Sequence, residues 1–396
     1  MLAKYGLPEQ VRFCTRCVIS NMRPNSTREF SHTAASKKAT IHFDEHGVCD
    51  ACRVAEAKAR IDWEAREREL ISLCDWHRSL SGAYDCIVPG SGGKDSFYAA
   101  HILKHKYKMH PLLVTWAPHI PTEWGARNLR RWQSIADHIL VTPNIDTHRL
   151  LTRLAVENLF HPFQPFVIGQ KAMPPKMAAL YNIPLVVYGE NEADYGNPIA
   201  DSSSPYRSKS YHAAGGEIYL GGLSTTELEQ RYGLRESDLV PYLPANPETL
   251  ERAEVEVHYL GYYLRWKPQE CYYYAAENGG FEAAPERTPG TYSKYNSIDD
   301  KLDDLHYWTT WIKFGIGRAT YDAAQEIRSG DITREEGVSL VRRFDGEWPA
   351  RFETELFDYL SVDGFPRMDK AAFLALAEKF KSPHLWNGDK LRYQVG

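Results

Sequence analysis

The sequence contains no long apolar run and no excess of positive charge. Its 396 residues carry a net charge of −5, with 43% hydrophobic and 25% charged residues. No segment approaches the roughly 18 apolar residues that a membrane-spanning helix requires, and the first residues, MLAKYGLPEQVRFC, lack the apolar block of a secretory signal. The net charge provides no overall positive field to hold a nucleic acid. We therefore expect a cytoplasmic protein whose partners include neither a membrane nor a nucleic acid.

Cysteine is scarce and unevenly distributed. Four of the seven cysteines lie in residues 1–60, where Cys14 and Cys17 form one Cys-x-x-Cys motif and Cys49 and Cys52 form another. Two such motifs are typical of a structural Zn²⁺ site with four thiolate ligands. Residues 1–60 show little apolar periodicity, so metal binding would supply their folding energy. A redox pair would need only one motif, and unrelated cysteines would not be paired in this way.

Short apolar runs alternate with helical patterns between residues 84 and 191. The runs are almost continuously apolar, which is typical of strands that are buried on both faces. The alternation predicts an α/β fold, with a parallel sheet and helices on both of its faces. The predicted strands are 84–90, 111–117, 138–143 and 183–191, and the predicted helices between them are 95–108, 122–137 and 147–160.

Weaker signals surround this alternation. A helix is predicted at 61–80, capped by Asp62, and a broken helix at 167–182, because Pro174 and Pro175 interrupt it. The apolar face of the first of these helices comprises Leu70, Leu73, Trp76 and Leu80.

The remainder of the chain is predicted to be an insertion followed by a mainly helical region. Residues 195–250 are rich in Ser, Gly, Pro and Tyr, and we interpret them as a partly irregular insertion or lid. A helix is predicted at 297–330, starting at Ser297 and Asp300 and ending at Gly330. We expect three units: a zinc-binding segment at 1–60, a nucleotide-binding domain at 61–195, and an insertion with a helical substrate region at 196–396.

The stretch VPGSGGKDSFYAAH, at 88–101, joins the first predicted strand to a helix. Gly90, Gly92 and Gly93 allow the backbone to approach an anion closely. The N–H groups of the loop and of the following helix would then point at that anion. The spacing is neither that of a Walker A loop nor that of a dinucleotide-binding turn.

The side chains of this loop also suit a polyphosphate. Ser91 and Ser96 supply hydroxyl groups, and Lys94 supplies a positive charge. Asp95 would repel phosphate unless it binds Mg²⁺ or caps the following helix, and both interpretations are compatible with the sequence.

Other strand ends extend the candidate site. Val114, Thr115 and Trp116 end the second strand, where parallel sheets bind ligands. Their backbone is a candidate adenine contact, while the side chains of Val114 and Trp116 fit the core equally well. Glu190 and Asn191 follow the last strand and are candidate ligands of Mg²⁺ or of a ribose.

Two further groups are less specific. Lys171 is either a second phosphate-binding cation or a solvated lysine. Asp300, Lys301 and Asp304 are predicted to share one face of a helix, which is usually a solvated arrangement.

The pattern Ser-Gly-Gly-x-Asp-Ser after an apolar strand resembles the PP-loop of the N-type ATP pyrophosphatases. These enzymes cleave ATP between its α and β phosphates. The resemblance implies that ATP is a substrate, that Mg²⁺ is a cofactor and that residues 90–96 hold the leaving pyrophosphate. Lys94 and Asp95 would then be the catalytic residues.

Taken whole, the chain resembles the N-acetyl sugar amidotransferase family, which forms acetamidino groups on bacterial surface sugars, as in lipopolysaccharide O-antigen. The resemblance rests on FCTRCVISNMRP, GVCDACR, YDCIVPGSGGKDS and VVYGENEADYGN, and on the block from 292 to 337. Asp194 and Asn197 depart from the family pattern, which has glutamate and glycine there. The resemblance implies Asp194, Lys294, Asp300 and Lys301 as groups near the sugar.

The implied reaction is the ATP-dependent conversion of an acetamido group to an acetamidino group. The amide oxygen of a nucleotide-activated sugar, or of a related nonulosonic acid, takes AMP, and ammonia then displaces the AMP. No Cys-His glutaminase pattern is recognisable in the chain, so the ammonia would come from a separate glutaminase or from solution. The resemblance favours a partner glutaminase.

Two other functions remain open at this point. The first is a PP-loop enzyme that modifies tRNA by thiolation or lysidine formation, but no cysteine lies between residues 87 and 270. The second is a non-catalytic nucleotide-binding scaffold, which the intact Ser-Gly-Gly-Lys-Asp-Ser loop disfavours.

Overall fold

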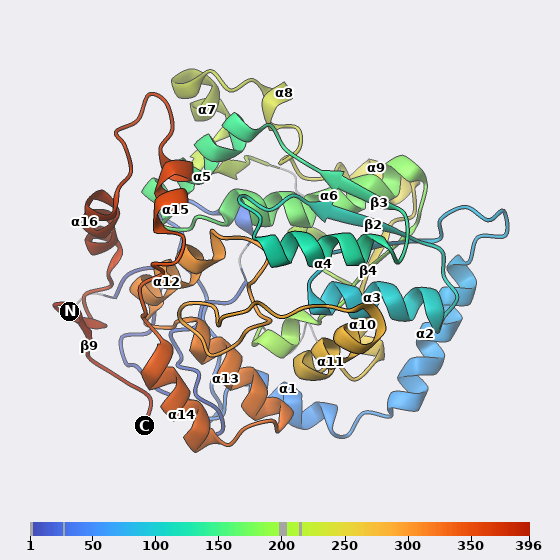
Figure 1. The fold of residues 1–396 in the computed structure, drawn as a ribbon, viewed down its shortest axis with the longest axis horizontal. Helices are drawn as coiled ribbons and strands as arrows, with labels where there is room; N and C mark the ends of the chain where they lie inside the picture. The colour runs from blue at the N-terminus through green and yellow to red at the C-terminus, as the bar shows by residue number, and fades with distance from the viewer. Residues whose placement is uncertain (1–2, 27, 198–203, 214–215) are drawn as a thin grey trace.

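A five-stranded parallel sheet lies at the centre of the chain (Figure 1). The computed structural model describes residues 3–26, 28–197, 204–213 and 216–396. The strand order is β3-β2-β1-β4-β7, and every neighbouring pair is parallel. These strands are β1 (Cys86–Pro89), β2 (Pro111–Trp116), β3 (His138–Val141), β4 (Leu185–Tyr188) and β7 (Glu256–Tyr259).

Helices cover both faces of this sheet, as the sequence predicts. The helices of the first two thirds of the chain are α1 (Asp50–Lys58), α2 (Trp63–His77), α3 (Lys94–His105), α4 (Glu123–Gln133), α5 (Ile145–Leu159), α6 (Gln164–Tyr181), α7 (Thr225–Tyr232), α8 (Glu236–Leu239), α9 (Pro247–Arg252) and α10 (Leu260–Tyr263). They are followed by α11 (Pro268–Gly279), α12 (Asp303–Phe314), α13 (Arg318–Ser329), α14 (Arg334–Phe344), α15 (Glu353–Leu360) and α16 (Lys370–Phe380).

Short elements complete the description. They are the 3-10 helices η1 (Glu29–Ser31), η2 (Glu192–Tyr195) and η4 (Lys209–Tyr211), and the two-residue strands β5 (Tyr219–Leu220), β6 (Leu223–Ser224), β8 (Trp386–Asn387) and β9 (Lys390–Leu391). The predicted insertion at 195–250 contains β5, β6 and α7 to α9, and its residues 198–203 and 214–215 lie outside the described residues.

The two-residue period of the strands separates two apolar layers. Cys86 and Val88 of β1 pack in one cluster with Phe97 of α3. Ile87, between them, packs in another cluster with Ala178 of α6. Because both faces are covered, β1 and β4 are apolar throughout and β2 is mostly apolar, and these runs could be recognised in the sequence.

The fifth strand, β7, was not predicted. Its sequence is Glu-Val-His-Tyr, which lacks a continuous apolar run. His258 is nevertheless 1% exposed, because its Nδ1 lies 2.8 Å from the hydroxyl oxygen of Tyr263 and its Nε2 lies 3.1 Å from Oε2 of Glu256. Hydrogen bonding thus allows a polar residue to occupy a buried strand.

The predicted break at Pro174 and Pro175 is wrong, because α6 continues through both prolines. A proline at 174 removes the N–H that would bond to the carbonyl oxygen of Gln170. That oxygen instead accepts a hydrogen bond from the hydroxyl of Tyr188, at 3.4 Å. The prolines are also buried on the face that covers the sheet, so packing offsets the cost of the missing bonds.

The predicted apolar face of α2 is only partly correct. Asp62 caps the helix by accepting from the N–H of Ala65, and Leu70 is buried. Trp76 and Leu80 are 84% and 101% exposed, because the end of α2 and the loop after it project beyond the body of the protein (Figure 1).

The single helix predicted at 297–330 is two helices, α12 and α13. Gly315 ends α12 in the left-handed conformation, with φ +67°, and so breaks the helical pattern. Ser297 does not cap a helix, and Asp300 lies in an isolated bridge with Pro121 before α12 begins. Asp300, Lys301 and Asp304 therefore do not share a helical face.

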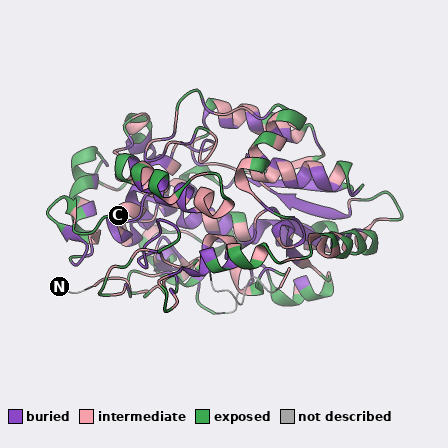
Figure 2. Cartoon of the chain, turned by 90° about the horizontal axis from the view of Figure 1, so that it is seen from below, coloured by how far each residue is buried: buried purple, intermediate pink, exposed green. Residues whose placement is uncertain are grey.

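The N-terminal segment is more buried than its composition indicated. Val18, Ile19 and Met22 belong to one core cluster with residues of α5, α6 and the helices α12 to α16. In Figure 2 the buried residues gather in the interior, and the exposed residues lie on the outer faces of the helices and on the loops. No helix among the described residues has the length and apolar character needed to cross a bilayer.

Asp300 fixes the start of the C-terminal region against the loop after β2. Its Oδ2 accepts from the backbone N–H of His119, at 2.6 Å, and lies 2.7 Å from His119 Nδ1. Its Oδ1 accepts from the N–H groups of Ile120 and Leu302, at 3.2 and 3.0 Å. The side chain is 3% exposed, so water does not replace these bonds.

We expect Asp300→Ala to lower the free energy of unfolding by at least about 3 kcal/mol, because three backbone donors lose their acceptor. Denaturant unfolding measures this change. Asp358→Asn is the control, since Asp358 pairs with Arg367 at the surface and should contribute less than about 1 kcal/mol. Equal effects of the two substitutions would contradict the assignment.

Candidate functional site

The candidate site lies where the chain changes direction across the sheet. β1 pairs with β2 on one side and with β4 on the other. In open parallel sheets the carboxyl ends of strands at such a point flank a ligand-binding crevice. Here the glycine-rich loop follows β1, and Gly189 and Glu190 follow β4.

Close packing fixes the shape of the glycine-rich loop. Gly92 has φ +82°, and a Cβ there would lie 2.7 Å from the Cα of Leu129 in α4. A Cβ on Gly90 would lie 2.1 Å from that of Ser96. Both positions therefore require glycine.

The loop is also held by a chain of side chains. Thr115, in β2, donates to the carbonyl oxygen of Gly90 at 2.6 Å. His138 Nε2 lies 2.9 Å from the same hydroxyl, and its Nδ1 lies 3.0 Å from Nε2 of Gln133. Thr115 thus contacts the loop through its side chain. The sequence had instead made its backbone a candidate contact of adenine.

The first residues of α3 carry the charges of the site. Gly93 precedes the helix and no side chain among the described residues caps it, so its first N–H groups face the loop. Lys94 Nζ lies 2.5 Å from Oδ2 of Asp95. The other oxygen of Asp95, Oδ1, is buried with no hydrogen-bond partner in the described part of the chain.

Glu190 provides a second carboxylate beside Asp95. Burial raises the pKa of Glu190, and the charge of Asp95 raises it further. Gly189 allows this approach, since a Cβ there would lie 3.3 Å from the carbonyl oxygen of Asp95 and 2.6 Å from Trp266. An orphaned carboxylate oxygen next to a second carboxylate fits a divalent cation with oxygen ligands, such as Mg²⁺.

The opposite wall of the site comes from the C-terminal region. Asp299 faces Ser91, and burial raises the pKa of Asp299 while a hydrogen bond with Ser91 opposes the rise. The N–H of Thr122 donates to the carbonyl oxygen of Asp299 at 3.1 Å, and a Cβ on Gly125 would lie 2.6 Å from the Cα of Asp299. The backbones of α4 and of the segment before α12 are therefore in close contact.

These walls enclose a cavity of about 280 Å³, called the phosphate cavity below. Its lining residues are Ser91, Gly92, Gly93, Lys94, Asp95, Gly125, Asn128, Tyr195, Phe281, Tyr295, Asn296, Ser297, Ile298, Asp299, Tyr307, Arg318 and Gln325.

A second cavity of about 320 Å³, called the inner cavity below, lies next to it. The two cavities share Tyr195, Tyr307, Arg318 and Gln325 as lining residues. Three guanidinium groups line the inner cavity, those of Arg23, Arg318 and Arg328, together with the carboxylates of Glu190 and Asp322. A cavity of this composition suits a ligand that carries negative charge.

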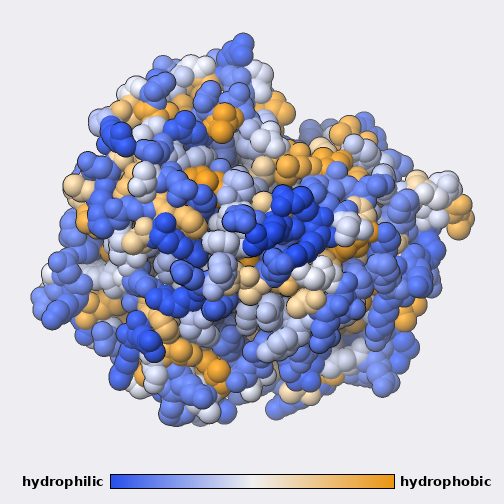
Figure 3. All heavy atoms as spheres, viewed as in Figure 1, coloured by the Kyte–Doolittle hydropathy of each residue, from blue (hydrophilic) through white to orange (hydrophobic). Residues whose placement is uncertain are grey.

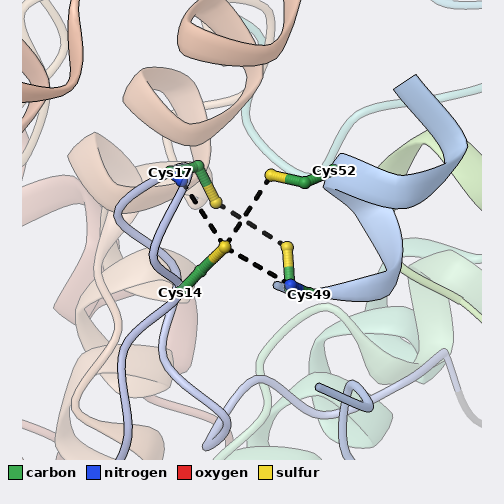
Figure 4. Close-up of side chains that lie close together, drawn as sticks. All are labelled: Cys14, Cys17, Cys49 and Cys52. Carbon is green, nitrogen blue, oxygen red and sulfur yellow. Dashed lines mark hydrogen bonds between the residues drawn. The ribbon is translucent and has the colours of Figure 1, made fainter. Parts of the chain in front are cut away.

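The four cysteines form one cluster, as predicted (Figure 4). The Sγ atoms of Cys14 and Cys52 lie 3.8 Å apart, and those of Cys17 and Cys49 lie 3.7 Å apart. Four thiolates at 2.3 Å from a tetrahedral zinc ion would be separated by about 3.8 Å. Cys14 Sγ also accepts from the N–H groups of Arg16, Cys17 and Cys49, which is favourable for a thiolate. The residues present therefore fit Zn²⁺.

Several residues predicted for the site lie outside both cavities. Val114 and Trp116 are 1% and 4% exposed, and Trp116 packs against α6, where a Cβ on Gly169 would lie 2.3 Å from its ring. Lys171 Nζ lies 4.7 Å above the ring of Tyr211.

The predicted sugar-binding residues also have other contacts. Lys294 is exposed and donates to the carbonyl oxygen of Pro285, and Lys301 pairs with Glu355 at 2.5 Å. Asp194 Oδ2 accepts from Lys58 Nζ at 2.8 Å, beside the inner cavity. Asn191 caps η2 through its side chain, and Asp304 binds Arg351.

Sequence reasoning missed the residues that close the site from the C-terminal side. Asp299, not Asp300, faces the loop, and Arg318 lies at the start of α13. Both lie in the block at 292–337 that the sequence analysis singled out. The sequence alone does not show which of two adjacent aspartates faces the loop, because this depends on the backbone conformation.

Two comparisons with known proteins each match part of the chain. Residues 289–396 match the family model described as LPS biosynthesis protein WbpG-like, C-terminal domain. A stretch of 83 residues is 34% identical to the uncharacterized protein MJ1599 of Methanocaldococcus jannaschii. That stretch covers 21% of this chain and 29% of MJ1599.

Among solved structures, the NMN synthetase of Francisella tularensis aligns with 78% of this chain and 100% of its own, at 11% identity and a TM-score of 0.31. The fold class rests on the strand order and the helix layers described above.

On the face shown in Figure 3, hydrophilic residues predominate and gather over α4, which carries Arg127, Arg130 and Arg131. Arg127 and Arg131 pair with Glu282, so part of this charge is neutralised locally.

We expect Gly92→Ala to destabilise the fold by about 2 kcal/mol or more and to abolish Mg²⁺-ATP binding, because a Cβ meets the backbone of α4 in a left-handed conformation. Thermal unfolding and calorimetric titration measure the two effects. Gly93→Ala is the matched control for stability, since its Cβ has space and should change stability by less than about 0.5 kcal/mol. A Gly92→Ala protein as stable as Gly93→Ala would refute the packing described here.

We expect one zinc ion per chain, and we expect Cys49→Ser to lose it, because a thiolate ligand is removed. Metal analysis of the purified protein measures the zinc content. Cys74→Ala is the control, since Cys74 is equally buried but lies outside the cluster. Retention of a full zinc complement in Cys49→Ser would show that the cluster is not the zinc site.

Proposed function

We propose that the protein is an ATP-dependent, AMP-forming amidotransferase that converts an acetamido group of a nucleotide-activated sugar to an acetamidino group. The observation that carries this proposal is the adjacency of the two cavities. One is lined by a glycine-rich loop suited to a polyphosphate, and the other by three guanidinium groups suited to an anionic acceptor. A phosphorus atom bound in the first cavity and an acceptor oxygen bound in the second would meet at the shared wall, which supports the proposal.

In this proposal residues 90–96 and the N-terminus of α3 bind the pyrophosphate half of ATP. Lys94, which pairs with Asp95 and lines the phosphate cavity, would neutralise charge on the phosphates. Arg318, which lines both cavities, stabilises the negative charge that develops between them.

Asp95 and Glu190 would hold Mg²⁺. The ion supplies charge neutralisation on the phosphate oxygens when bound. Burial and the charge of Asp95 raise the pKa of Glu190, and a bound cation would stabilise both carboxylates in their charged form.

The bonds formed and broken balance without a covalent protein intermediate. The amide oxygen attacks the α-phosphorus, and the bond to the β-phosphate breaks, which releases pyrophosphate. Ammonia then attacks the amide carbon, the C–O bond to AMP breaks, and one proton is lost. A partner glutaminase is the proposed source of the ammonia. The substrate panel described below would identify the sugar and its nucleotide carrier.

The cysteines outside the cluster support this reaction over sulfur transfer. Cys74, Cys86 and Cys271 are all buried, at 1%, 0% and 2% exposure. Burial raises the pKa of each thiol, to about 12 for Cys74, so none is poised as a thiolate nucleophile.

Mass spectrometry of a substrate panel tests the proposal. The protein is incubated with ATP, Mg²⁺, ammonium and nucleotide-activated 2-acetamido sugars. The expected product is lighter than its substrate by the difference between an oxygen atom and an NH group, and AMP and pyrophosphate accompany it. A product without this difference would sink the proposal. No AMP with any sugar would favour a non-catalytic scaffold, and strong salt-sensitive RNA binding would favour a tRNA-modifying enzyme.

We expect Asp95→Asn to abolish AMP release while leaving the fold intact, because the amide keeps the shape of the side chain but does not hold the cation. Turnover assays and circular dichroism measure the two properties. Full turnover in Asp95→Asn would show that the carboxylate has no role in the reaction.

A further inference from the structure

The four-cysteine cluster lies against the inner cavity, and each Cys-x-x-Cys motif contributes to the cavity wall. Ile19 lies two residues after Cys17, and Ala51 lies between Cys49 and Cys52; both line the inner cavity. They are 3% and 2% exposed, so the cavity wall next to both motifs is buried.

The chain between the two motifs forms more of the same wall. Arg23, Ser26 and Ile41 line the inner cavity as well. Five of its seventeen lining residues therefore come from the segment whose conformation the metal would fix. The wall is packed tightly, since a Cβ on Gly196 would lie 2.6 Å from Ile41 and 3.5 Å from the Cβ of Ala51.

Arg328, near the end of α13, connects the cluster with the cavity. It lines the inner cavity, and its Nη2 donates to the carbonyl oxygen of Asp194 at 3.2 Å. Ala51, between Cys49 and Cys52, lines the same cavity, and α1 contacts α13, so Arg328 lies on the side of the cavity formed by the second Cys-x-x-Cys motif. A zinc ion with four thiolates has a net charge of −2, so the cluster retains a negative charge that attracts this guanidinium group when metal is bound.

α1 provides a second connection. The helix begins directly after Cys49 and ends at Lys58, whose Nζ donates to Oδ2 of Asp194 at 2.8 Å. Asp194 lies in η2 beside Tyr195, which lines both cavities. The ends of α1 are thus fixed at the cluster and at the shared cavity wall.

We propose that the four-cysteine centre is part of the acceptor site, where it positions Arg328 to bind an anionic group of the acceptor in the inner cavity. The metal ligands touch neither ATP nor the acceptor, so the cysteines are positioning residues. The identity of the acceptor rests on the proposed function, but oxyanion binding and its coupling to the metal can be measured without turnover.

The test uses the full-length protein with Co²⁺ in place of zinc, because the absorption of cobalt thiolates reports the geometry of the centre. The phosphate cavity is first saturated with Mg²⁺ and α,β-methylene-ATP, and inorganic phosphate is then titrated as the oxyanion probe. Calorimetry measures its binding, and visible absorption measures the response of the cobalt centre. We expect phosphate to bind and to shift the cobalt bands.

Three variants make the assignment specific. Arg328→Met should keep one metal per chain, weaken phosphate binding by about tenfold or more and abolish the shift. Arg328→Lys should keep the metal and part of the affinity, since it retains the charge but not the planar fork. Arg334→Met is the matched control: Arg334 donates to the carbonyl oxygen of Cys14 at 3.4 Å but lines neither cavity.

The possible results test the anion site and its coupling to the metal centre separately. Phosphate that binds without any change in the cobalt bands would overturn the coupling, and absence of phosphate binding would overturn the anion site. Equal loss of the response in Arg334→Met and Arg328→Met would show a merely structural effect. None of these results depends on amidine formation, so a failure here is distinguishable from a failure of the proposed function.

Discussion

Three hydrogen bonds from His119 and Ile120 to the buried carboxylate of Asp300 hold the C-terminal region against the loop after β2 of the parallel sheet. The segment around Asp300 lies along residues 119–122 like a short added strand, and this places Asp299 opposite the glycine-rich loop. Without this contact the loop would face solvent on one side. The phosphate cavity, and the cavity that adjoins it, therefore depend on a single buried acidic side chain with satisfied acceptors.

Opposite charges are close together in the site. Lys94 pairs with Asp95, Arg318 pairs with Asp322, and Arg328 lines the inner cavity together with Glu190. Each acidic group thus has a cation within the site or space for one. When metal is bound, the negative charge of the cysteine cluster would further offset the positive charge of the arginines that line the inner cavity.

The sequence predicted four of the five strands and the position of the glycine-rich loop well, because their signals are local. Continuous apolar runs fix the strands, and the glycines at 90, 92 and 93 have few alternative uses between a strand and a helix. β7 escaped prediction because its histidine is buried through hydrogen bonds, and α6 was predicted to break because the compensating contact from Tyr188 lies in another element. Neither contact follows a residue spacing by which a strand or a helix is recognised in a sequence.

The residues of the C-terminal region that line the two cavities were predicted least well, for a related reason. Asp299 and Asp300 are adjacent and chemically identical, but Asp299 faces the glycine-rich loop and Asp300 accepts a hydrogen bond from the backbone of His119. Arg318, Gln325 and Arg328 repeat along α13 at helical spacing, and only the packing of that helix shows that this face lines a cavity. The family model covers residues 289–396, which include all of these residues but not the phosphate loop. In the proposed reaction, recognition of the acceptor and cleavage of ATP would depend on different parts of the chain, which meet at the shared wall formed by Tyr195, Tyr307, Arg318 and Gln325.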